Sequence, residues 1–339
     1  MSERAKEILV VGLILILSII VYLGKVGGWI GALAFSPAVS IVVIILIFLA
    51  LVWMLVRTLR GQLLDRRIVF LFVALAVVLP FFMSITQEIK ISPEVQQLYD
   101  ALESLPPGSK VLVSFDYDPP SAPELQPMAE SFLRYCLLND LKVIIMGLWP
   151  QGPQQADLAL QAALADPRVQ QKNLEYGVDY VNLGFQAGNE FVIQRMGANI
   201  ESMFPRDYTG SAYRDLPLVR NVKNFSNIDY AFNLSAGYPG TQEWVQVAVD
   251  RYGLWMGAGN TAVQAPMMYA YVNAGQLEGL LGGMNGAAEF ELLTGLPGKG
   301  TKYMLSQSFA HMVVIAFVII GNAAFLTSGR KKQPLGQGK

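Results

Sequence analysis

Two aspartates separated by one residue, Asp116 and Asp118, are the side chains whose types and spacing most directly allow chemistry. Neighbouring carboxylates supply the oxygen ligands that Mg²⁺ and Ca²⁺ require. Aspartate is also common in the turns that follow strands, where it bonds to nearby backbone. We therefore weigh a site for a divalent cation or small polar ligand against a purely structural turn. Apart from that cation, no cofactor is predicted.

The spacing of Asp116 and Asp118 resembles the Asp-x-Asp pair of the aspartate-nucleophile phosphatases, whose carboxylates would hold Mg²⁺. Pro119 and Pro120 follow, where those enzymes usually place a small hydroxyl residue. No later motif of paired aspartates is found among the downstream strands. The resemblance implies a hydrolase, and these two departures from the pattern count against it.

Ser235 offers a second catalytic hypothesis, because it lies between a predicted strand and a predicted helix. A hydroxyl at such a place can act as a nucleophile beside an oxyanion site. Its general base would have to be a lysine. The structural alternative is that Ser235 forms a turn bond and Thr241 caps the helix.

The chain contains one cysteine, Cys136, and one histidine, His311, and this scarcity excludes several reaction classes. A zinc site needs several histidine or cysteine ligands, and a disulfide needs two cysteines. A nucleophile relay needs a histidine beside the nucleophile, whereas His311 lies inside the last apolar segment. We expect His311 to be an interfacial anchor. The composition favours a non-enzymatic protein.

The candidate residues are positioned by a regular alternation of strand and helix patterns. Strands are predicted over residues 110–115, 142–149, 178–184, 229–235 and 254–259, with amphipathic helical stretches between them. This alternation predicts a doubly wound, mostly parallel α/β domain with helices on both faces. Ligands of such sheets bind beyond the carboxyl ends of the strands. Asp116, Asp118, Ser235 and Asn260 are therefore the candidate ligand-binding residues.

A long final helix is predicted over residues 267–294, with small residues at every fourth position: Gly275, Gly279, Gly283 and Ala287. On one helix these residues form a single flat ridge. Each interior glycine costs about 1 kcal/mol relative to alanine, so the ridge is best explained by close packing of another backbone. The partner is either the sheet of the same domain or a second subunit. The alternative is that these glycines break the segment into a loop.

The chain also has a membrane-protein composition, with 53% hydrophobic residues, 15% charged residues and a mean hydropathy of +0.38. Four transmembrane helices are predicted at about residues 8–24, 39–56, 68–84 and 307–327. Basic residues gather between the second and third and after the fourth: Arg57, Arg60, Arg66, Arg67, Arg330, Lys331 and Lys332. By the positive-inside rule both clusters are cytoplasmic.

This topology places both termini in the cytoplasm and the α/β domain outside it, in what we expect to be a bacterial cytoplasmic membrane. Residues 1–83 form the anchor, residues 84–303 the domain, and residues 304–339 the fourth helix and a basic tail. A cleaved signal peptide is the alternative for the first segment, because Ala32, Leu33 and Ala34 have the small-x-small form of a cleavage site.

The charges divide unevenly between these parts. Residues 84–303 carry 14 Lys/Arg and 23 Asp/Glu, a net charge of −9, and the rest carries 11 and 3, a net charge of +8. An acidic domain argues against a nucleic-acid partner. We expect a non-enzymatic membrane subunit that assembles with itself or with another membrane protein. The alternatives are an extracytoplasmic sensor or binding module for a small polar ligand or divalent cation, and a hydrolase based on Ser235 or the aspartates.

Overall fold

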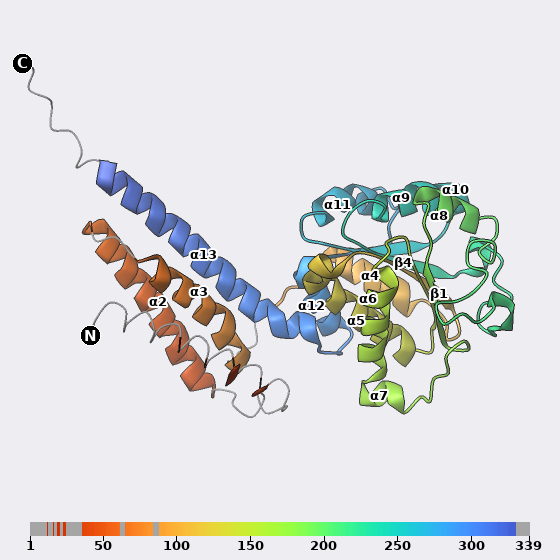
Figure 1. Ribbon diagram of the computed structural model, residues 1–339, viewed down its shortest axis with the longest axis horizontal. Helices are drawn as coiled ribbons and strands as arrows, with labels where there is room; N and C mark the ends of the chain where they lie inside the picture. Colours follow the sequence, from red (N-terminus) through yellow and green to blue (C-terminus); the bar gives the residue numbers. More distant parts are fainter. Residues whose placement is uncertain are drawn as a thin grey trace, which may run out of the picture. The chain divides into compact units, whose positions relative to one another are not determined.

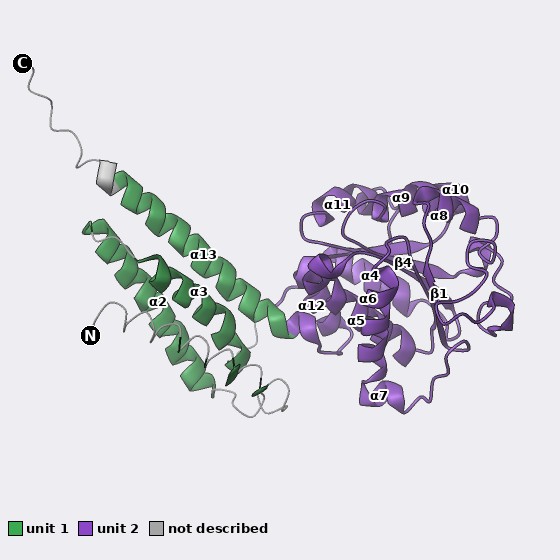
Figure 2. Ribbon diagram, in the orientation of Figure 1, with its two compact units in different colours: residues 1–88, 302–339 green, residues 89–301 purple. Residues whose placement is uncertain are grey.

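The computed structural model describes residues 36–61, 65–83 and 88–329, together with residues 12, 16, 19, 20, 23 and 24. The chain forms two compact units, residues 1–88 with 302–339, and residues 89–301 (Figure 2). Most of the predicted span at residues 8–24 and the basic cluster Arg330, Lys331 and Lys332 lie outside the described residues.

The first unit contains two helices long and apolar enough to cross a membrane among the described residues. They are α2 (Pro37–Leu59) and the part of α13 (Lys299–Gly329) that ends at Leu326. These two helices and residues 66–83 share one apolar cluster, whose buried members are Ile47, Leu51, Ala76, Met83, Phe309 and Val313. Arg57 and Arg60 lie at the end of α2, where the guanidinium of Arg57 stacks over the Trp53 ring at 4.9 Å.

The predicted third span differs from the structure. The α-helix α3 (Arg66–Val78) contains 13 residues and continues as a 3₁₀ turn, η2 (Leu79–Phe82). Pro80 explains the change, because it has no backbone N–H with which to continue the helical hydrogen bonds. At about 1.5 Å per residue, α3 alone covers roughly 20 Å. The structure therefore shows two membrane-length helices among the described residues, where four were predicted over the whole chain.

The second unit is built on one six-stranded sheet whose pairings are all parallel. The strands are β1 (Lys110–Asp116), β2 (Lys142–Gly147), β3 (Tyr180–Phe185), β4 (Tyr230–Ser235), β5 (Met256–Asn260) and β6 (Leu280–Gly282). Their order is β3-β2-β1-β4-β5-β6, so the direction of winding reverses between β1 and β4. The prediction of a parallel α/β sheet is confirmed, and β6 is an additional strand.

Helices cover both faces of this sheet (Figure 1). One core contains residues of α4 (Pro93–Glu103), α5 (Ala122–Leu138), α6 (Gly152–Leu164) and α12 (Gly283–Leu293). The other contains residues of α8 (Glu190–Met196), α9 (Thr241–Trp244), the π-helical turn η6 (Val245–Val249) and α11 (Ala265–Asn273). Short helices complete the unit: α7 (Pro167–Gln170), α10 (Asp250–Tyr252), η3 (Pro119–Ser121), η4 (Tyr213–Asp215) and η5 (Phe225–Asn227).

The predicted glycine ridge is wrong, because residues 267–294 do not form one helix. Gly275, Gly279 and Gly283 each have a positive φ, at 70°, 105° and 57°, and they lie at the breaks around β6. Glycine is used here because it adopts this backbone at little cost. Ala287 is fully buried on α12. The three glycines therefore form the bends on either side of β6, and they do not line one face of a helix.

Replacing Gly279 with alanine tests this correction. An added Cβ would lie 2.4 Å from the backbone nitrogen of Leu98 and 2.5 Å from the carbonyl oxygen of Glu94, at a φ of 105°. We expect a loss of about 2–4 kcal/mol of unfolding free energy in a urea titration, from backbone strain and overpacking. Gly275→Ala is the control, because its site is open and carries backbone strain alone. On a continuous helix both substitutions would stabilise the protein.

Two buried glutamates of α12 fix the two ends of the second unit. Glu289 accepts hydrogen bonds from the backbone N–H and the hydroxyl of Ser92, at 2.7 and 2.6 Å, where α4 begins. Glu291 accepts from the backbone N–H groups of Gly298, Gly300 and Thr301, at 2.8, 2.9 and 2.8 Å. It also accepts from the Thr301 hydroxyl at 2.6 Å. One helix therefore holds the segments through which the chain enters and leaves this unit.

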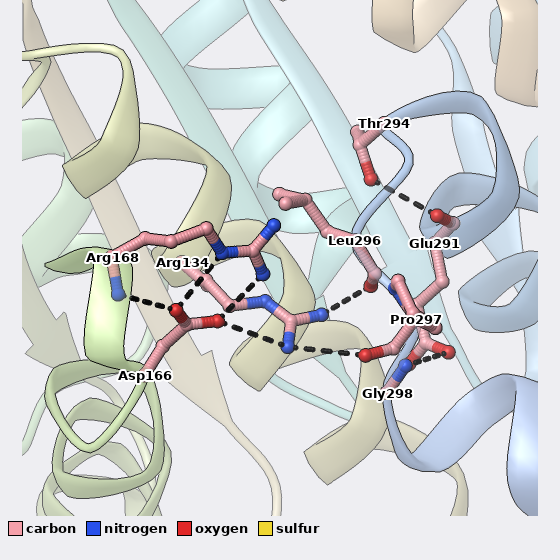
Figure 3. Close-up of polar contacts among 8 residues, drawn as sticks. All are labelled: Arg134, Asp166, Arg168, Glu291, Thr294, Leu296, Pro297 and Gly298. Atoms are coloured by element: carbon pink, nitrogen blue, oxygen red, sulfur yellow. Dashed lines mark hydrogen bonds and ion pairs between the residues drawn. The ribbon is translucent and has the colours of Figure 1, made fainter.

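The segment from Leu296 to Thr301 is held from its other side by Arg134 of α5 (Figure 3). The guanidinium donates to the carbonyl oxygen of Pro297 at 3.3 Å and to that of Leu296, and it lies 3.7 Å from the Asp166 carboxylate. A cation thus binds the carbonyls of the segment while the Glu291 anion binds its amides. This division matches the polarity of the peptide group.

Candidate functional site

The sheet brings three of the four predicted ligand-binding residues into one row. Asp116 ends β1 and is in register with Ser235 of β4, which is in register with Asn260 of β5. All three are buried, at 1% exposure or less. Residues in register on neighbouring parallel strands point to the same face, so these side chains line the carboxyl edge of the sheet on one side. The row lies at the point where the winding reverses.

The carboxylate of Asp116 accepts four hydrogen bonds. Oδ1 accepts from the backbone N–H of Leu148 at 2.7 Å. Oδ2 accepts from Nδ2 of Asn233 at 2.6 Å, from the hydroxyl of Ser114 at 2.8 Å and from Nε1 of Trp244 at 2.9 Å. Groups of the protein itself therefore surround both oxygens.

Burial raises the pKa of Asp116 to about 6, although each of the four hydrogen bonds favours the ionised form and lowers it. The loss of hydration is the larger effect. Asp116 is thus a carboxylate above about pH 7, and it becomes protonated in mildly acidic solution. A buried charge without an ionic partner is costly, which explains why four donors converge on it.

Asp118 is separated from Asp116. β1 ends at Asp116, and Asp118 precedes the turn η3, where its Oδ1 accepts a hydrogen bond from the Ser121 hydroxyl at 3.0 Å. Among the described residues, no group of three or more histidine, cysteine, aspartate or glutamate side chains is placed to hold a metal ion. The geometry of the two aspartates matches turn chemistry at Asp118 and a buried structural anchor at Asp116.

A pocket of about 330 Å³ opens beside Ser235 and Asn260. Its volume lies within the range of pockets for small molecules. Hydroxyl and amide groups contribute most of its polar lining, with one carboxylate and three larger side chains: Ser235, Thr241, Gln242, Asn260, Gln264, Glu243, Tyr238, Met267 and Met268. The pocket residues include no lysine, arginine or histidine.

Ser235 forms a local turn. Its hydroxyl donates to the carbonyl oxygen of Gly237 at 3.1 Å, and its oxygen lies 3.3 Å from the Gly237 N–H. The backbone at Gly240 passes directly over it, because a Cβ there would lie 1.9 Å from the Ser235 hydroxyl oxygen. With no basic side chain lining the pocket, this arrangement does not provide the base that a serine nucleophile requires.

Asn233 and Thr241 connect Asp116 to the pocket. The Thr241 hydroxyl donates to Oδ1 of Asn233 at 2.7 Å and lies 2.9 Å from Nδ2 of Asn260. Asn233 was not among the ligand-binding residues predicted from the sequence, and Thr241 was considered only as a helix cap. A usable signal was present, since Asn233 and Ser235, like Ser114 and Asp116, occupy alternate positions of an apolar strand and therefore share a face.

A comparison of the chain with protein-family models, with curated proteins and with solved structures finds no match in any of the three.

Proposed function

We propose that this chain is a membrane-anchored binding module that holds a small polar ligand at the carboxyl ends of β4 and β5. The observation that carries the proposal is the pocket of about 330 Å³ into which the buried polar row of Ser235, Thr241 and Asn260 opens. Buried polar groups are costly unless they are hydrogen-bonded. Ser235 and Thr241 have partners in the protein, and a ligand in the pocket would supply the hydrogen bonds that the protein leaves unmade beside them.

Binding explains this site better than catalysis does. The Asp116 carboxylate is enclosed by four donors, and the Ser235 hydroxyl is occupied in its own turn. Asp116 is not among the residues that line the pocket, and no basic side chain lines the pocket to activate Ser235. Neutral amides and hydroxyls recognise ligands by shape and hydrogen bonding, without transferring protons.

For the topology we propose that the domain lies outside the cytoplasm. The arginines at the end of α2 and the start of α3 favour a cytoplasmic loop, so α3 and η2 would have to cross the membrane for the domain to lie outside it. Thirteen α-helical residues and four 3₁₀ residues cover roughly 28 Å together. That is close to the 30 Å hydrocarbon core, so the 3₁₀ turn after Val78 lends support to a third crossing.

Ligand screening by thermal shift tests the binding proposal on the full-length protein in detergent. A ligand at 100 times its Kd stabilises the native state by about 2.7 kcal/mol, which corresponds to a rise in Tm of roughly 5–10 °C for a unit of this size. We expect this rise with the unchanged protein and with the surface control Gln161→Ala, and its loss with Asn260→Ala. A compound whose effect survives in Asn260→Ala binds elsewhere and contradicts this site.

Assembly with a second copy or another membrane protein is a second proposal. The glycine ridge no longer supports it, but exposed apolar side chains at the start of α11 do. Val263 is 84% exposed and Met267 is 60% exposed. The mass of the detergent-solubilised particle tests this proposal, and a strictly monomeric particle would refute self-association.

A further inference from the structure

The polar groups between Asp116 and the pocket have only one consistent direction of hydrogen bonding. An ionised carboxylate can only accept hydrogen bonds. Asn233 must therefore turn its NH₂ group toward Oδ2 of Asp116, at 2.6 Å, and its carbonyl oxygen toward Thr241. It follows that the Thr241 hydroxyl donates its proton to Asn233, at 2.7 Å.

The same direction of hydrogen-bond donation extends from Thr241 to Asn260. The single proton of the Thr241 hydroxyl is used on Asn233, so the Thr241 oxygen can only accept, and it accepts from Nδ2 of Asn260 at 2.9 Å. Oδ1 of Asn260 lies 3.1 Å from the same oxygen, but no proton is left there for it. No other described group donates to this Oδ1. Asn260 is 1% exposed and lines the pocket.

A carbonyl oxygen without a donor in the described part of the protein, on a residue that lines a pocket, favours a ligand that donates a hydrogen bond. We propose that the pocket selects a small, uncharged, hydroxyl-rich molecule, a polyol or sugar, one of whose hydroxyls donates to Oδ1 of Asn260. This inference rests on the proposed function and adds the chemical class of the ligand.

The other pocket groups agree with that class. Because no basic side chain lines the pocket, the charge of an anion would be left unpaired. The one carboxylate, Glu243, already accepts from the backbone N–H of Gly240 at 2.8 Å, which weakens the case for a cation. The amides of Gln242 and Gln264 both donate and accept, as a hydroxyl does. The lining therefore matches a ligand whose groups have both capacities.

The test is a calorimetric titration of the full-length protein in detergent at pH 7.5 with three sets of probes. Glucose, galactose, myo-inositol and sorbitol carry hydroxyl donors, the pentamethyl ether of glucose accepts but cannot donate, and gluconate and glucose 6-phosphate are anionic. We expect at least one hydroxyl probe to bind, and the ether and anions to bind at least tenfold more weakly. This comparison needs no variant and so does not depend on one folding.

Two variants locate the effect. Asn260→Ala removes the acceptor, and we expect it to weaken the best hydroxyl probe at least tenfold. Thr241→Val removes the oxygen that accepts from Nδ2 of Asn260, so the amide can turn its NH₂ group toward the pocket. We expect this variant to bind an ether about as well as the matching polyol. If the variant keeps a tenfold preference for the polyol, the directed chain of hydrogen bonds is refuted.

The outcomes separate this inference from the proposed function. If the unchanged protein binds the ether or an anion, and Asn260→Ala does not, the inference about the ligand class is overturned. The pocket would still be a binding site. If neither these probes nor the broader thermal-shift panel binds in a way that depends on Asn260, the binding function and the inference fall together.

Discussion

Replacing Glu291 with glutamine is expected to destabilise the protein by about 2–3 kcal/mol and to loosen residues 298–301 before the rest of the domain. Glu291 is 1% exposed and accepts four hydrogen bonds. Three of them reach Oε2, so the glutamine oxygen takes that place and its NH₂ group faces the backbone N–H of Gly300. Two donors then oppose each other in a buried site, at a cost of about 1–3 kcal/mol beyond the lost bond.

Hydrogen exchange on the full-length protein measures this effect at the residues concerned. We expect the amides of Gly298, Gly300 and Thr301 to exchange faster in Glu291→Gln, and the amide of Ser92 to keep its protection. Glu289→Gln should give the reverse pattern, because Glu289 holds Ser92. Glu175→Gln, on an exposed side chain, is the neutral control. If either variant speeds amide exchange equally at Ser92 and at residues 298–301, the two glutamates do not hold these segments independently.

Through the hydrogen bonds of Glu289 and Glu291, α12 also connects the candidate site to the two ends of the unit. α12 begins at Gly283, directly after Gly282, which is in register with Asn260. Its Glu289 and Glu291 then hold the segments at Ser92 and at residues 298–301. A short run of chain therefore extends from the row of pocket residues to both segments that connect this unit to the first unit. This continuity is a property of the fold and needs no conformational change.

The parallel sheet was predictable because its central strands are apolar runs separated by amphipathic helices. β6 was not, because Leu280, Leu281 and Gly282 are too few to show a strand period. The glycines around β6 occur at a four-residue spacing, and this spacing imitates a helix face. What decides their structure is the close approach of Gly279 to α4, where a Cβ would overlap the Leu98 backbone. That contact joins residues about 180 positions apart and leaves no local signal in the sequence.

The sequence predicted that candidate residues would meet at the strand ends, but it did not predict the contacts that they make there. The rule that ligands meet strand ends identified Asp116, Ser235 and Asn260, and the sheet register places them in one row. The pairing of Asp116 with Asp118 was misleading, because one strand residue and one turn residue need not face each other. The donors around Asp116 come from β1, β4, α9 and the end of β2, and only the folded sheet brings them together.

Replacing Asp116 with asparagine is expected to change how stability depends on pH. Burial raises the pKa of Asp116 from 3.8 to about 6. Because the folded state binds this proton more tightly than the unfolded state, its contribution to stability is complete below about pH 3.8 and is lost as pH rises through about 6. At about 1.4 kcal/mol per pKa unit the total is about 3 kcal/mol. Asparagine does not titrate, so the variant lacks this decline.

The variant has a cost of its own that does not depend on pH. Three donors meet at Oδ2 of Asp116, so the asparagine oxygen takes that place and its NH₂ group faces the backbone N–H of Leu148. We expect asparagine to be less stable by about 1–3 kcal/mol near pH 4. Between pH 4 and pH 7.5 the unchanged protein should then lose about 2.5 kcal/mol of stability relative to the variant, so that asparagine becomes as stable as aspartate or more stable.

Urea titrations of both full-length proteins between pH 4 and pH 7.5, followed by near-ultraviolet circular dichroism, measure this relative change in stability. The other carboxyl groups titrate in both proteins, so their contribution to stability cancels when one curve is subtracted from the other. Ser114→Ala supplies an independent check, because it removes a hydrogen bond that lowers the pKa of Asp116. We expect it to move the midpoint of the decline to higher pH. Parallel curves for Asp116→Asn and the unchanged protein would mean that Asp116 does not titrate in this range, and that another buried group controls the response to acid.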